Sequence, residues 1–404
     1  MPYPVLPRLS LPALLLAALS INIAPGQEED RPSVPQRNVA DSLQPFVNRH
    51  ILAGAVTLVA SKDKILQIGA VGYADVAAKK PMHTDDLFWI ASMSKPITAA
   101  ALMMLVDEGQ VHVDDPVEKY LPEFHGQMVA VEEDADHVLL KKPAHPITVR
   151  NLLTHTSGLP FMSRVEHRID TLPLREAVLS YALSPLKFGP GTRYEYSNAG
   201  INTVGRIIEV VSGMPYEEFL QKRLLKPLGM KDTTFRPTEA QVQRLARSYK
   251  AKPGHSGLEE IPINQLTYPL TSTNRYPCPA GGLFSTAADL SCFCRMILAQ
   301  GIFEGRRYLS PEAIQQMTTT QTPDKPGMPS YGFGWSVEKS SPGGKGLLSP
   351  GSFGHGGAYS TQMWIDPQKQ LVLVLLVQHA GFPDGEGGKM NQAIQRAAVD
   401  QWGR

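Results

Sequence analysis

The 404-residue sequence has little of three features that mark particular classes of protein: excess charge, cysteine and long apolar runs. Lysine and arginine number 39 and aspartate and glutamate 38, so the formal net charge of +1 gives no electrostatic basis for binding nucleic acid or an anionic membrane. Three cysteines are too few for a disulfide framework. Cys292 and Cys294 have no second pair at zinc-ligand spacing, so we expect small buried side chains and no metal site.

Two catalytic motifs are also absent. The chain has no G-x-S-x-G, which the nucleophile of an α/β-hydrolase requires. Its eleven histidines include no H-E-x-x-H or similar spacing, which argues against a metalloenzyme. We therefore expect an activity that needs no metal and no other cofactor.

The apolar stretch near the amino terminus predicts export rather than anchoring. The run 11–19 follows a positively charged start, is too short for a membrane span and is interrupted by Pro12. Small residues stand at Ala24 and Gly26, as before a signal-peptidase cut. Residues 1–26 are therefore predicted to be a signal peptide, and the mature protein to be periplasmic or secreted, without a stable membrane anchor.

After a polar linker, 27–36, the patterns predict one domain, 37–404, of the α/β (α+β) class. Helical periodicity predicts helices at 39–47, 92–108, 148–154, 202–211, 216–225, 286–300 and 390–402. Apolar or alternating segments predict strands at 55–60, 65–71, 331–337, 353–365 and 371–378. Thr286 and Asp289 are placed as a capping box, and 126–146 fits a surface hairpin or a mobile loop.

These elements predict an antiparallel sheet to which both ends of the chain contribute strands. The N- and C-terminal helices flank it. The middle of the chain, 109–285, is expected to form a large, mostly helical inserted lobe without strands. A cleft between sheet and lobe is a natural ligand site.

The candidate nucleophile is Ser92, three residues before Lys95 where a helix begins. Residues i and i+3 share one face of a helix, so the two side chains are predicted to point into the same cleft. A neighbouring base is the usual means of activating a serine. Taken alone, the pair is better explained by a helix cap and a solvated cation, so the assignment depends on partners elsewhere.

A first set of partners is Tyr196 and Asn198, a Tyr-x-Asn pair on a loop after a turn rich in glycine. The phenol can accept the Ser92 proton and return it to a leaving group, and the amide can bind a substrate carbonyl or the Lys95 amine. A buried tyrosine and a turn asparagine would explain this pair if it stood alone.

A second set lies at 354–358, at the start of a strand. Glycines such as Gly357 allow a substrate to lie against the strand edge. The N–H groups of Ala358 and Ser92 can together form an oxyanion hole. His355 can contact a substrate carboxylate or tune Lys95 and Tyr196. A structural role, with the ring hydrogen-bonded to the backbone, explains this histidine equally well.

In this order, Ser-x-x-Lys, Tyr-x-Asn and His-x-Gly resemble the motifs of class C β-lactamases and penicillin-binding-protein-like serine hydrolases, a family that includes family VIII-type esterases and D-peptidases. The resemblance covers nearly all of the mature chain, with further matching segments at 152–159, 227–230, 281–286 and 331–335. It implies the serine β-lactamase/transpeptidase-like fold and a covalent acyl-enzyme. The catalytic residues that it implies are Ser92 as nucleophile with Lys95 and Tyr196 as base and proton shuttle. The implied substrate-binding residues are Asn198, His355, Gly357 and Ala358.

His355 departs from the lactamases of this family, which have lysine there to help attract the β-lactam carboxylate. A histidine near its unperturbed pKa is largely neutral at pH 7 and a weaker anchor for an anion. We therefore expect a carboxylesterase or D-amino-acid peptidase that acts on a small ester, amide or peptide. The alternatives are a weak β-lactamase and a penicillin-binding sensor without turnover. No pattern in the sequence bears on the oligomeric state.

Overall fold

The computed structural model describes residues 1–5, 37–339 and 347–403. The chain divides into two units, Met1–Gln36 and Arg37–Arg404, and the described secondary structure lies in the second. Residues 6–26 of the predicted signal peptide, and the linker 27–36, lie outside the described residues. Within the described ranges, no helix combines the length and hydropathy that a membrane crossing needs.

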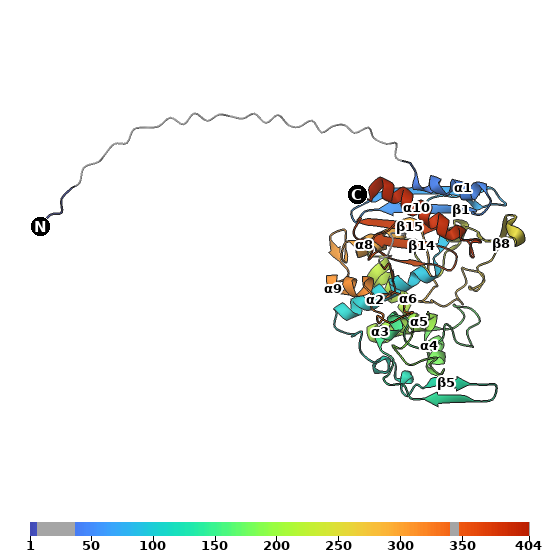
Figure 1. Cartoon of the computed structure of the whole chain (residues 1–404), viewed down its shortest axis with the longest axis horizontal. Coiled ribbons are helices and arrows are strands. Elements are labelled where there is room, and N and C mark those ends of the chain that lie inside the picture. Colours follow the sequence, from blue (N-terminus) through green and yellow to red (C-terminus); the bar gives the residue numbers. More distant parts are fainter. Residues whose placement is uncertain (6–36, 340–346, 404) are drawn as a thin grey trace, which may run out of the picture. The chain divides into compact units, whose positions relative to one another are not determined.

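A seven-stranded antiparallel sheet, with the order β12-β13-β14-β15-β1-β2-β3, is the framework of the second unit (Figure 1). Its strands are β1 (Gly54–Ala60), β2 (Ile65–Asp75), β3 (Lys80–Pro81), β12 (Ser336–Val337), β13 (Phe353–Gly356), β14 (Gln362–Asp366) and β15 (Leu371–Leu376). The first strand pairs with the last: Val56 lies opposite Leu376 and Ala60 opposite Val372. The predicted sheet shared by both ends of the chain is thus confirmed.

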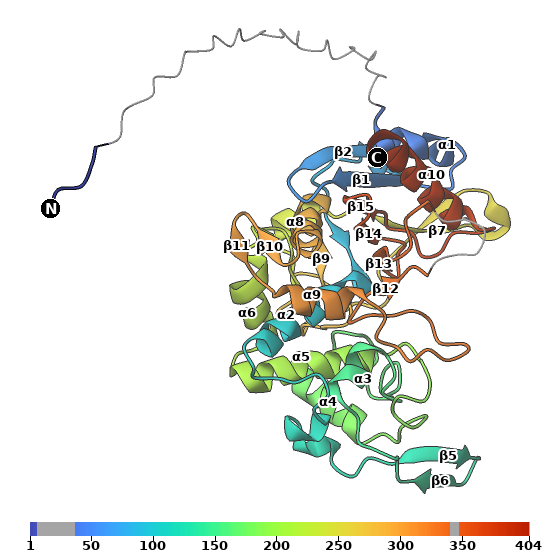
Figure 2. The ribbon, with the colours of Figure 1, turned by 60° about the vertical axis from the view of Figure 1, so that its left-hand side comes forward.

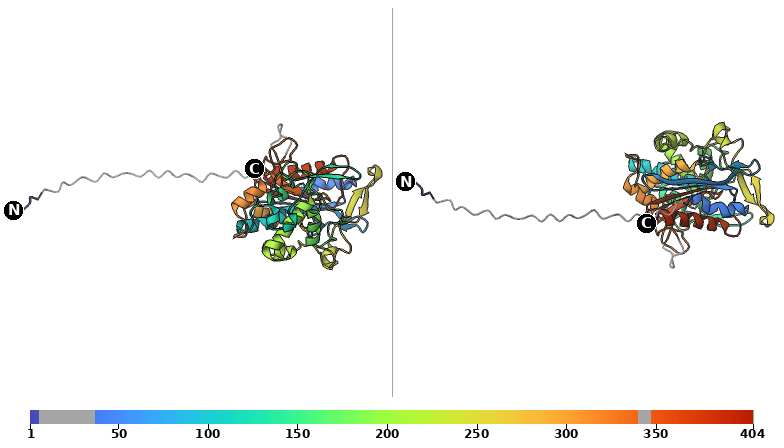
Figure 3. Two further views of the ribbon diagram at one scale, coloured as in Figure 1. Left: turned by 90° about the horizontal axis from the view of Figure 1, so that it is seen from below. Right: turned by 90° about the horizontal axis from the view of Figure 1, so that it is seen from above.

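Helices cover both faces of this sheet. The α-helices are α1 (Gln44–Asn48), α2 (Ser94–Asp107), α3 (Val149–Leu153), α4 (Leu174–Ala182), α5 (Asn198–Ser212), α6 (Tyr216–Leu220), α7 (Glu239–Gln243), α8 (Ala287–Leu298), α9 (Pro311–Thr318) and α10 (Glu386–Trp402). The shorter helical turns are η1 (Val39–Leu43), η2 (Ala91–Met93), η3 (Val117–Lys119), η4 (Pro122–Phe124), the π-turn η5 (Gln221–Leu225) and η6 (Pro253–His255). In Figure 3 the sheet lies between α10 with the first helices and the layer that contains α8.

Side chains of the central strands alternate between two hydrophobic clusters, one for each face. In β15, Val374 and Leu376 belong to the cluster shared with α8, whereas Leu373 and Leu375 belong to the cluster shared with η1 and α10. A strand presents successive side chains to opposite faces, so the unbroken apolar run of β15 reflects a strand that is buried on both sides. Each fully buried side chain of this size contributes about 1.5–3 kcal/mol.

Below the sheet lies the helical lobe, in which α2, α3, α4 and α5 pack together (Figure 2). Helix α2 joins lobe and sheet and is buried along almost its whole length. An apolar surface on all sides of a helix is typical of a position inside the core. The helix that carries Lys95 is therefore held from every side.

Three predictions about local structure are corrected. The region 109–285 does contain strands, β5 (Val129–Glu133) with β6 (Val138–Lys141) and β7 (Ser248–Ala251) with β8 (Leu258–Ile261). The first pair is the surface hairpin expected as one option for 126–146, and it projects from the lobe (Figure 1). Smaller pairs join β4 (Phe88–Trp89) to β9 (Phe284–Ser285) and β10 (Ile302–Phe303) to β11 (Arg306–Arg307).

The predicted strand 331–337 is mostly a turn, and only Ser336–Val337 is strand. Gly334 has a φ of +78° and lies against α2, where an added Cβ would be 3.1 Å from the Lys95 carbonyl oxygen. Glycine adopts this left-handed conformation without the steric cost that other residues incur. The segment therefore bends around α2 instead of continuing the sheet.

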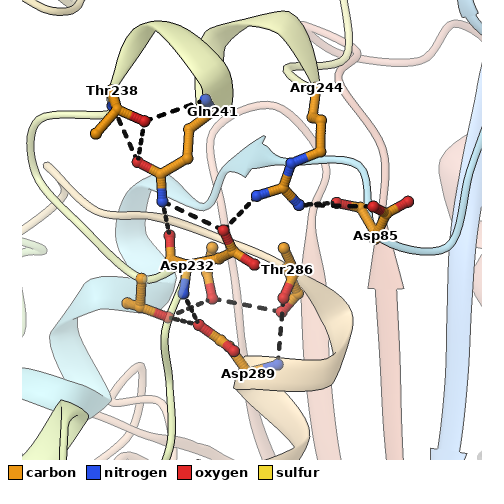
Figure 4. A network of polar contacts seen from close by, with 9 residues as sticks. Asp85, Asp232, Thr238, Gln241, Arg244, Thr286 and Asp289 are labelled. Atoms are coloured by element: carbon orange, nitrogen blue, oxygen red, sulfur yellow. Dashed lines mark hydrogen bonds and ion pairs between the residues drawn. The ribbon is translucent and has the colours of Figure 1, made fainter.

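The capping box predicted for α8 is only half formed. The Thr286 side chain accepts the Asp289 N–H at 3.3 Å, as a cap should. The Asp289 carboxylate instead accepts the N–H of Asp232 at 2.7 Å and the hydroxyl of Thr233 at 2.8 Å (Figure 4). A tertiary contact thus takes the place of the local one.

Candidate active site

Ser92 lies in η2, directly before the first turn of α2, so the helix begins two residues later than the predicted start at Ser92. The preceding residue, Ala91, has a φ of +45°, which is an unfavourable conformation for a residue with a Cβ. The Ser94 hydroxyl donates to the Ala91 carbonyl at 2.7 Å and accepts the Leu283 N–H at 3.2 Å. This packing holds the strained turn and presents Ser92 at the positive end of the helix dipole.

Lys95 is fully buried and surrounded by three oxygen atoms. Its Nζ lies 3.1 Å from Ser92 Oγ, 2.8 Å from Asn198 Oδ1 and 2.7 Å from the Ala280 carbonyl oxygen. Burial lowers the pKa of Lys95 to about 7, because an ammonium loses its hydration in the interior. Both protonation states are therefore populated near neutral pH.

Tyr196 contacts both Ser92 and Lys95. Its hydroxyl hydrogen-bonds Ser92, and Lys95 Nζ lies 4.6 Å from the centroid of its ring. Burial raises the pKa of Tyr196 well above its usual value, and the bond to Ser92 offsets only part of this. The phenol is thus neutral at pH 7, and the lysine faces its ring.

Asn198 is the first residue of α5, and its N–H donates to the Phe161 carbonyl at 3.1 Å. The adjacent Ser197 caps the helix by accepting the Gly200 N–H at 3.0 Å. These bonds fix the direction in which Asn198 leaves the helix. Its amide oxygen consequently points at Lys95.

The third predicted segment meets the first through the backbone. Gly357 donates its N–H to the Thr361 carbonyl at 2.8 Å, and an added Cβ would be 2.6 Å from the Ile90 carbonyl oxygen. The end of β13 therefore lies against the residues that lead into Ser92. Ala358 follows in an exposed turn.

His355 is buried on β13, and its ring centroid lies 6.1 Å from that of Tyr196. Burial, with a contribution from the nearby Lys95 charge, lowers the pKa of His355 to about 3. The imidazole is therefore neutral at pH 7, and no fixed positive charge stands at this position.

Residues for which the sequence predicted no role also contribute to the site. Ala280 supplies a carbonyl oxygen to Lys95, and His155 and Tyr331 pack beside Tyr196 and His355. The last two occur in the matched segments 152–159 and 331–335, but neither has a motif spacing to Ser92. The φ of His155 is +58°, another strained position beside the site.

A buried ion pair supports the loops beside the site. Arg275 Nε lies 2.7 Å from Asp170 Oδ2, and both side chains are almost fully buried. The Thr267 hydroxyl donates to the other Asp170 oxygen at 2.8 Å. Asp170 and Arg275 thereby join two loops that are distant in sequence.

All three cysteines are free, and Cys278 and Cys294 are buried, whereas Cys292 is partly exposed. No group of three histidine, cysteine, aspartate or glutamate side chains suited to a metal ion occurs in the described ranges. The polar side chains that meet around Lys95 are those of Ser92, Asn198 and Tyr196.

Comparison with known proteins agrees with this geometry. Residues 39–397 match the Beta-lactamase family. Esterase EstB of Burkholderia gladioli is 29% identical over 383 residues, which cover 86% of this chain and 90% of the esterase. The D-alanyl-D-alanine-carboxypeptidase/endopeptidase AmpH of Escherichia coli (strain K12) is 30% identical over 306 residues, covering 72% of this chain and 71% of AmpH.

Among solved structures, EstCE1, a hydrolase with promiscuous acyltransferase activity, superimposes with a TM-score of 0.74 and 25% sequence identity. The match covers 89% of this chain and 97% of EstCE1. The predicted fold and family are both confirmed. The chain belongs to the β-lactamase family and is a serine hydrolase.

Proposed function

We propose that this protein is an exported carboxylesterase that works through an acyl-enzyme on Ser92. The observation that carries the proposal is the arrangement of acceptors around Lys95. The oxygens of Asn198 and Ala280 can only accept hydrogen bonds. A neutral Lys95 amine satisfies both with its two N–H groups and keeps its lone pair for the Ser92 hydroxyl, 3.1 Å away. Lys95 is thereby suited to act as the general base.

Acylation then proceeds by proton transfer and bond exchange at Ser92. Lys95 takes the Ser92 proton, and Oγ forms a bond to the carbonyl carbon of the ester. The bond to the alcohol oxygen breaks, and this oxygen takes a proton from the neutral Tyr196 phenol. The Lys95 ammonium returns a proton to Tyr196. In deacylation, Lys95 takes a proton from a water molecule whose oxygen bonds to the acyl carbon. The bond from this carbon to Ser92 Oγ breaks, the acid is released, and Lys95 passes the proton to Oγ.

The negative charge that develops on the carbonyl oxygen is assigned to the N–H groups of Ser92 and Ala358. Ser92 stands before the first turn of α2, where the helix dipole also favours negative charge. Gly357 supports this assignment because its close approach to Ile90 fixes the backbone next to Ala358. Backbone donors held in this way stabilise the transition state without reorganising during the reaction.

The preference for uncharged esters over β-lactams rests on His355. Its neutral ring offers no fixed cation to the carboxylate of a penicillin or cephalosporin. The similarity to esterase EstB supports activity on esters. The similarity to AmpH supports D-amino-acid peptidase activity as a second candidate for the same serine and base.

Covalent labelling tests the nucleophile. We expect the mature protein to hydrolyse short-chain p-nitrophenyl esters and to be irreversibly labelled at Ser92 by a serine-directed phosphonate. Ser92→Ala should abolish both, whereas Ser61→Ala, which removes a hydroxyl from the β1–β2 turn, should change neither. Labelling that persists in Ser92→Ala would refute the assignment.

A rate panel tests the substrate class. The same preparation is given a simple ester, a cephalosporin and a peptide ending in D-Ala-D-Ala. We expect the ester to react fastest. A faster peptide would favour the second candidate, a faster cephalosporin would identify a β-lactamase, and a stable acyl adduct without turnover would identify a sensor.

Export is tested separately with the full chain expressed in a bacterial host. The signal sequence predicts a secreted or periplasmic product that begins at Gln27. Retention in the cytoplasm with an intact amino terminus would contradict this part of the proposal.

A further inference from the structure

Four hydrogen bonds form a continuous chain behind the site, from the Tyr196 loop to the end of β13. The Ser197 N–H lies 3.1 Å from His155 Nδ1, and His155 Nε2 lies 3.2 Å from the Tyr331 hydroxyl. The same hydroxyl lies 3.1 Å from His355 Nε2, and His355 Nδ1 lies 2.7 Å from the Gly356 carbonyl oxygen. The three side chains in the middle are all buried.

The two ends of this chain determine the position of every proton in it. A backbone N–H can only donate and a carbonyl can only accept. His155 must therefore accept at Nδ1, and as a neutral ring it carries its proton on Nε2, which donates to Tyr331. His355 must donate from Nδ1 to Gly356, so its Nε2 is bare and accepts the Tyr331 proton. The two histidines are thus opposite tautomers of the neutral ring.

We propose that Tyr331 is a positioning residue. Its hydroxyl donates to the bare Nε2 of His355, fixes the ring that donates from Nδ1 to Gly356, and thereby holds the Gly356–Ala358 backbone in place for catalysis. In the other tautomer, two bare acceptors would face each other across 2.7 Å, and the Gly356 carbonyl would be repelled. Gly356 directly precedes the segment to which we assign the second oxyanion donor. Tyr331 acts through His355 and does not itself touch the reacting atoms.

The chain also links the base to the oxyanion segment. Ser197 lies between Tyr196 and Asn198, and the His155 ring packs on the Tyr196 ring with centroids 4.4 Å apart. One end of the chain is therefore in the helical lobe and the other in the sheet. With both ring nitrogens of His355 occupied, neither is left to donate to a substrate carboxylate.

The catalytic part of this inference rests on the proposed esterase function, whereas its tautomers can be measured without any substrate. Protein with ¹⁵N-labelled histidine is studied by long-range ¹H–¹⁵N NMR, with His155→Gln and His355→Gln used to assign the two rings. We expect the Nε2–H form for His155 and the Nδ1–H form for His355. In Tyr331→Phe, the Gly356 carbonyl still selects the Nδ1–H form of His355, but Nε2 loses its donor, so the ¹⁵N resonance of this nitrogen should shift from its position in the parent.

The kinetic arm compares Tyr331→Phe with Tyr308→Phe. Tyr308 donates its hydroxyl to the Pro227 carbonyl at 2.8 Å, outside the site, and so controls for the loss of one bonded phenol. A displacement of about 1 Å in a site can cost about 100-fold in rate. We expect kcat of Tyr331→Phe on a p-nitrophenyl ester to fall about 10- to 100-fold with KM little changed, and Tyr308→Phe to keep the rate and the spectrum of the parent.

The Nε2–H form for His355 in the parent protein would overturn the proposal, whether or not Tyr331→Phe folds. Equal kcat values for the folded Tyr331→Phe and Tyr308→Phe variants would also overturn it. If the tautomers are as expected but Ser92 is not labelled by phosphonate, the proposed function fails and the arrangement of protons in the chain stands.

Discussion

Replacing Asn198 with aspartate tests whether Lys95 is the general base. The change is nearly isosteric and places a carboxylate where the amide oxygen now lies 2.8 Å from Lys95 Nζ. Asn198 is in the first turn of α5, where a negative charge is favoured by the helix dipole. We therefore expect Asn198→Asp to fold and the ammonium form of Lys95 to be stabilised.

The size of the effect follows from the pKa of Lys95. At a pKa of about 7, about half of the amine is neutral at pH 7, so kcat/KM of the parent should rise with pH through this value. An opposite charge at this distance raises the pKa of a lysine by about 1 to 3. With a rise of about 2, only about 1% of Lys95 is neutral at pH 7. The expected loss of kcat/KM at pH 7 is about 50-fold, and most of it should be recovered near pH 9 to 10.

The assay is the pH dependence of kcat/KM on a p-nitrophenyl ester for the parent, Asn198→Asp and Asn198→Ala. The alanine variant removes the acceptor without adding charge, so its activity should be lower while its acid limb stays near pH 7. An acid limb of Asn198→Asp that also stays near pH 7 would show that the titrating base is not Lys95. The proton transfer would then have to be assigned elsewhere.

Two further substitutions test the packing around the site. Gly357→Ala should lower kcat by about 100-fold, because its Cβ would lie 2.6 Å from the Ile90 carbonyl oxygen. Gly356→Ala should lose much less activity, because its Cβ would meet only ordinary contacts at 3.5 Å or more. Equal ester rates for the two variants would contradict this reasoning. Asp170→Ala should lower the free energy of unfolding by about 3–5 kcal/mol, because it leaves Arg275 buried and unpaired. Urea denaturation measures this loss, and a smaller loss in Asp170→Ala with Arg275→Met would identify the unpaired charge as its cause.

The sheet could be predicted from the sequence because its strands carry strong local signals. The β1–β2 hairpin and β15 consist mainly of apolar or β-branched residues bounded by polar turns. The sequence did not indicate β7 and β8, which are four residues long each and half polar. A short strand with few apolar residues is recognised only by the strand with which it pairs. The pairing of Tyr249 with Glu260 depends on the tertiary structure. The turn at Gly334 was missed for the same reason, since it is shaped by α2.

The candidate site was predictable to the extent that its chemistry depends on residue type and spacing. The Ser92–Lys95 pair follows from i, i+3 geometry, and the structure places Asn198 and Tyr196 in contact with it. The spacing of the motifs gave no indication that Lys95 would face the ring of Tyr196. Nor did it indicate that the Ala280 carbonyl would be one of the three oxygens around Lys95 Nζ. Those contacts depend on how α2, α5 and the segment before β9 pack together.

The charge state of His355 shows where sequence reasoning reaches its limit. A residue type gives a reference pKa, and from it the sequence predicted a ring that is largely neutral at pH 7. Burial strengthens that conclusion by lowering the pKa to about 3. The tautomer, however, is determined by a backbone N–H at Ser197 and a carbonyl at Gly356, which lie 159 positions apart and are joined only through His155 and Tyr331. What this histidine can offer a substrate is therefore a property of the folded chain, and variants at Tyr331 should alter it without changing His355 itself.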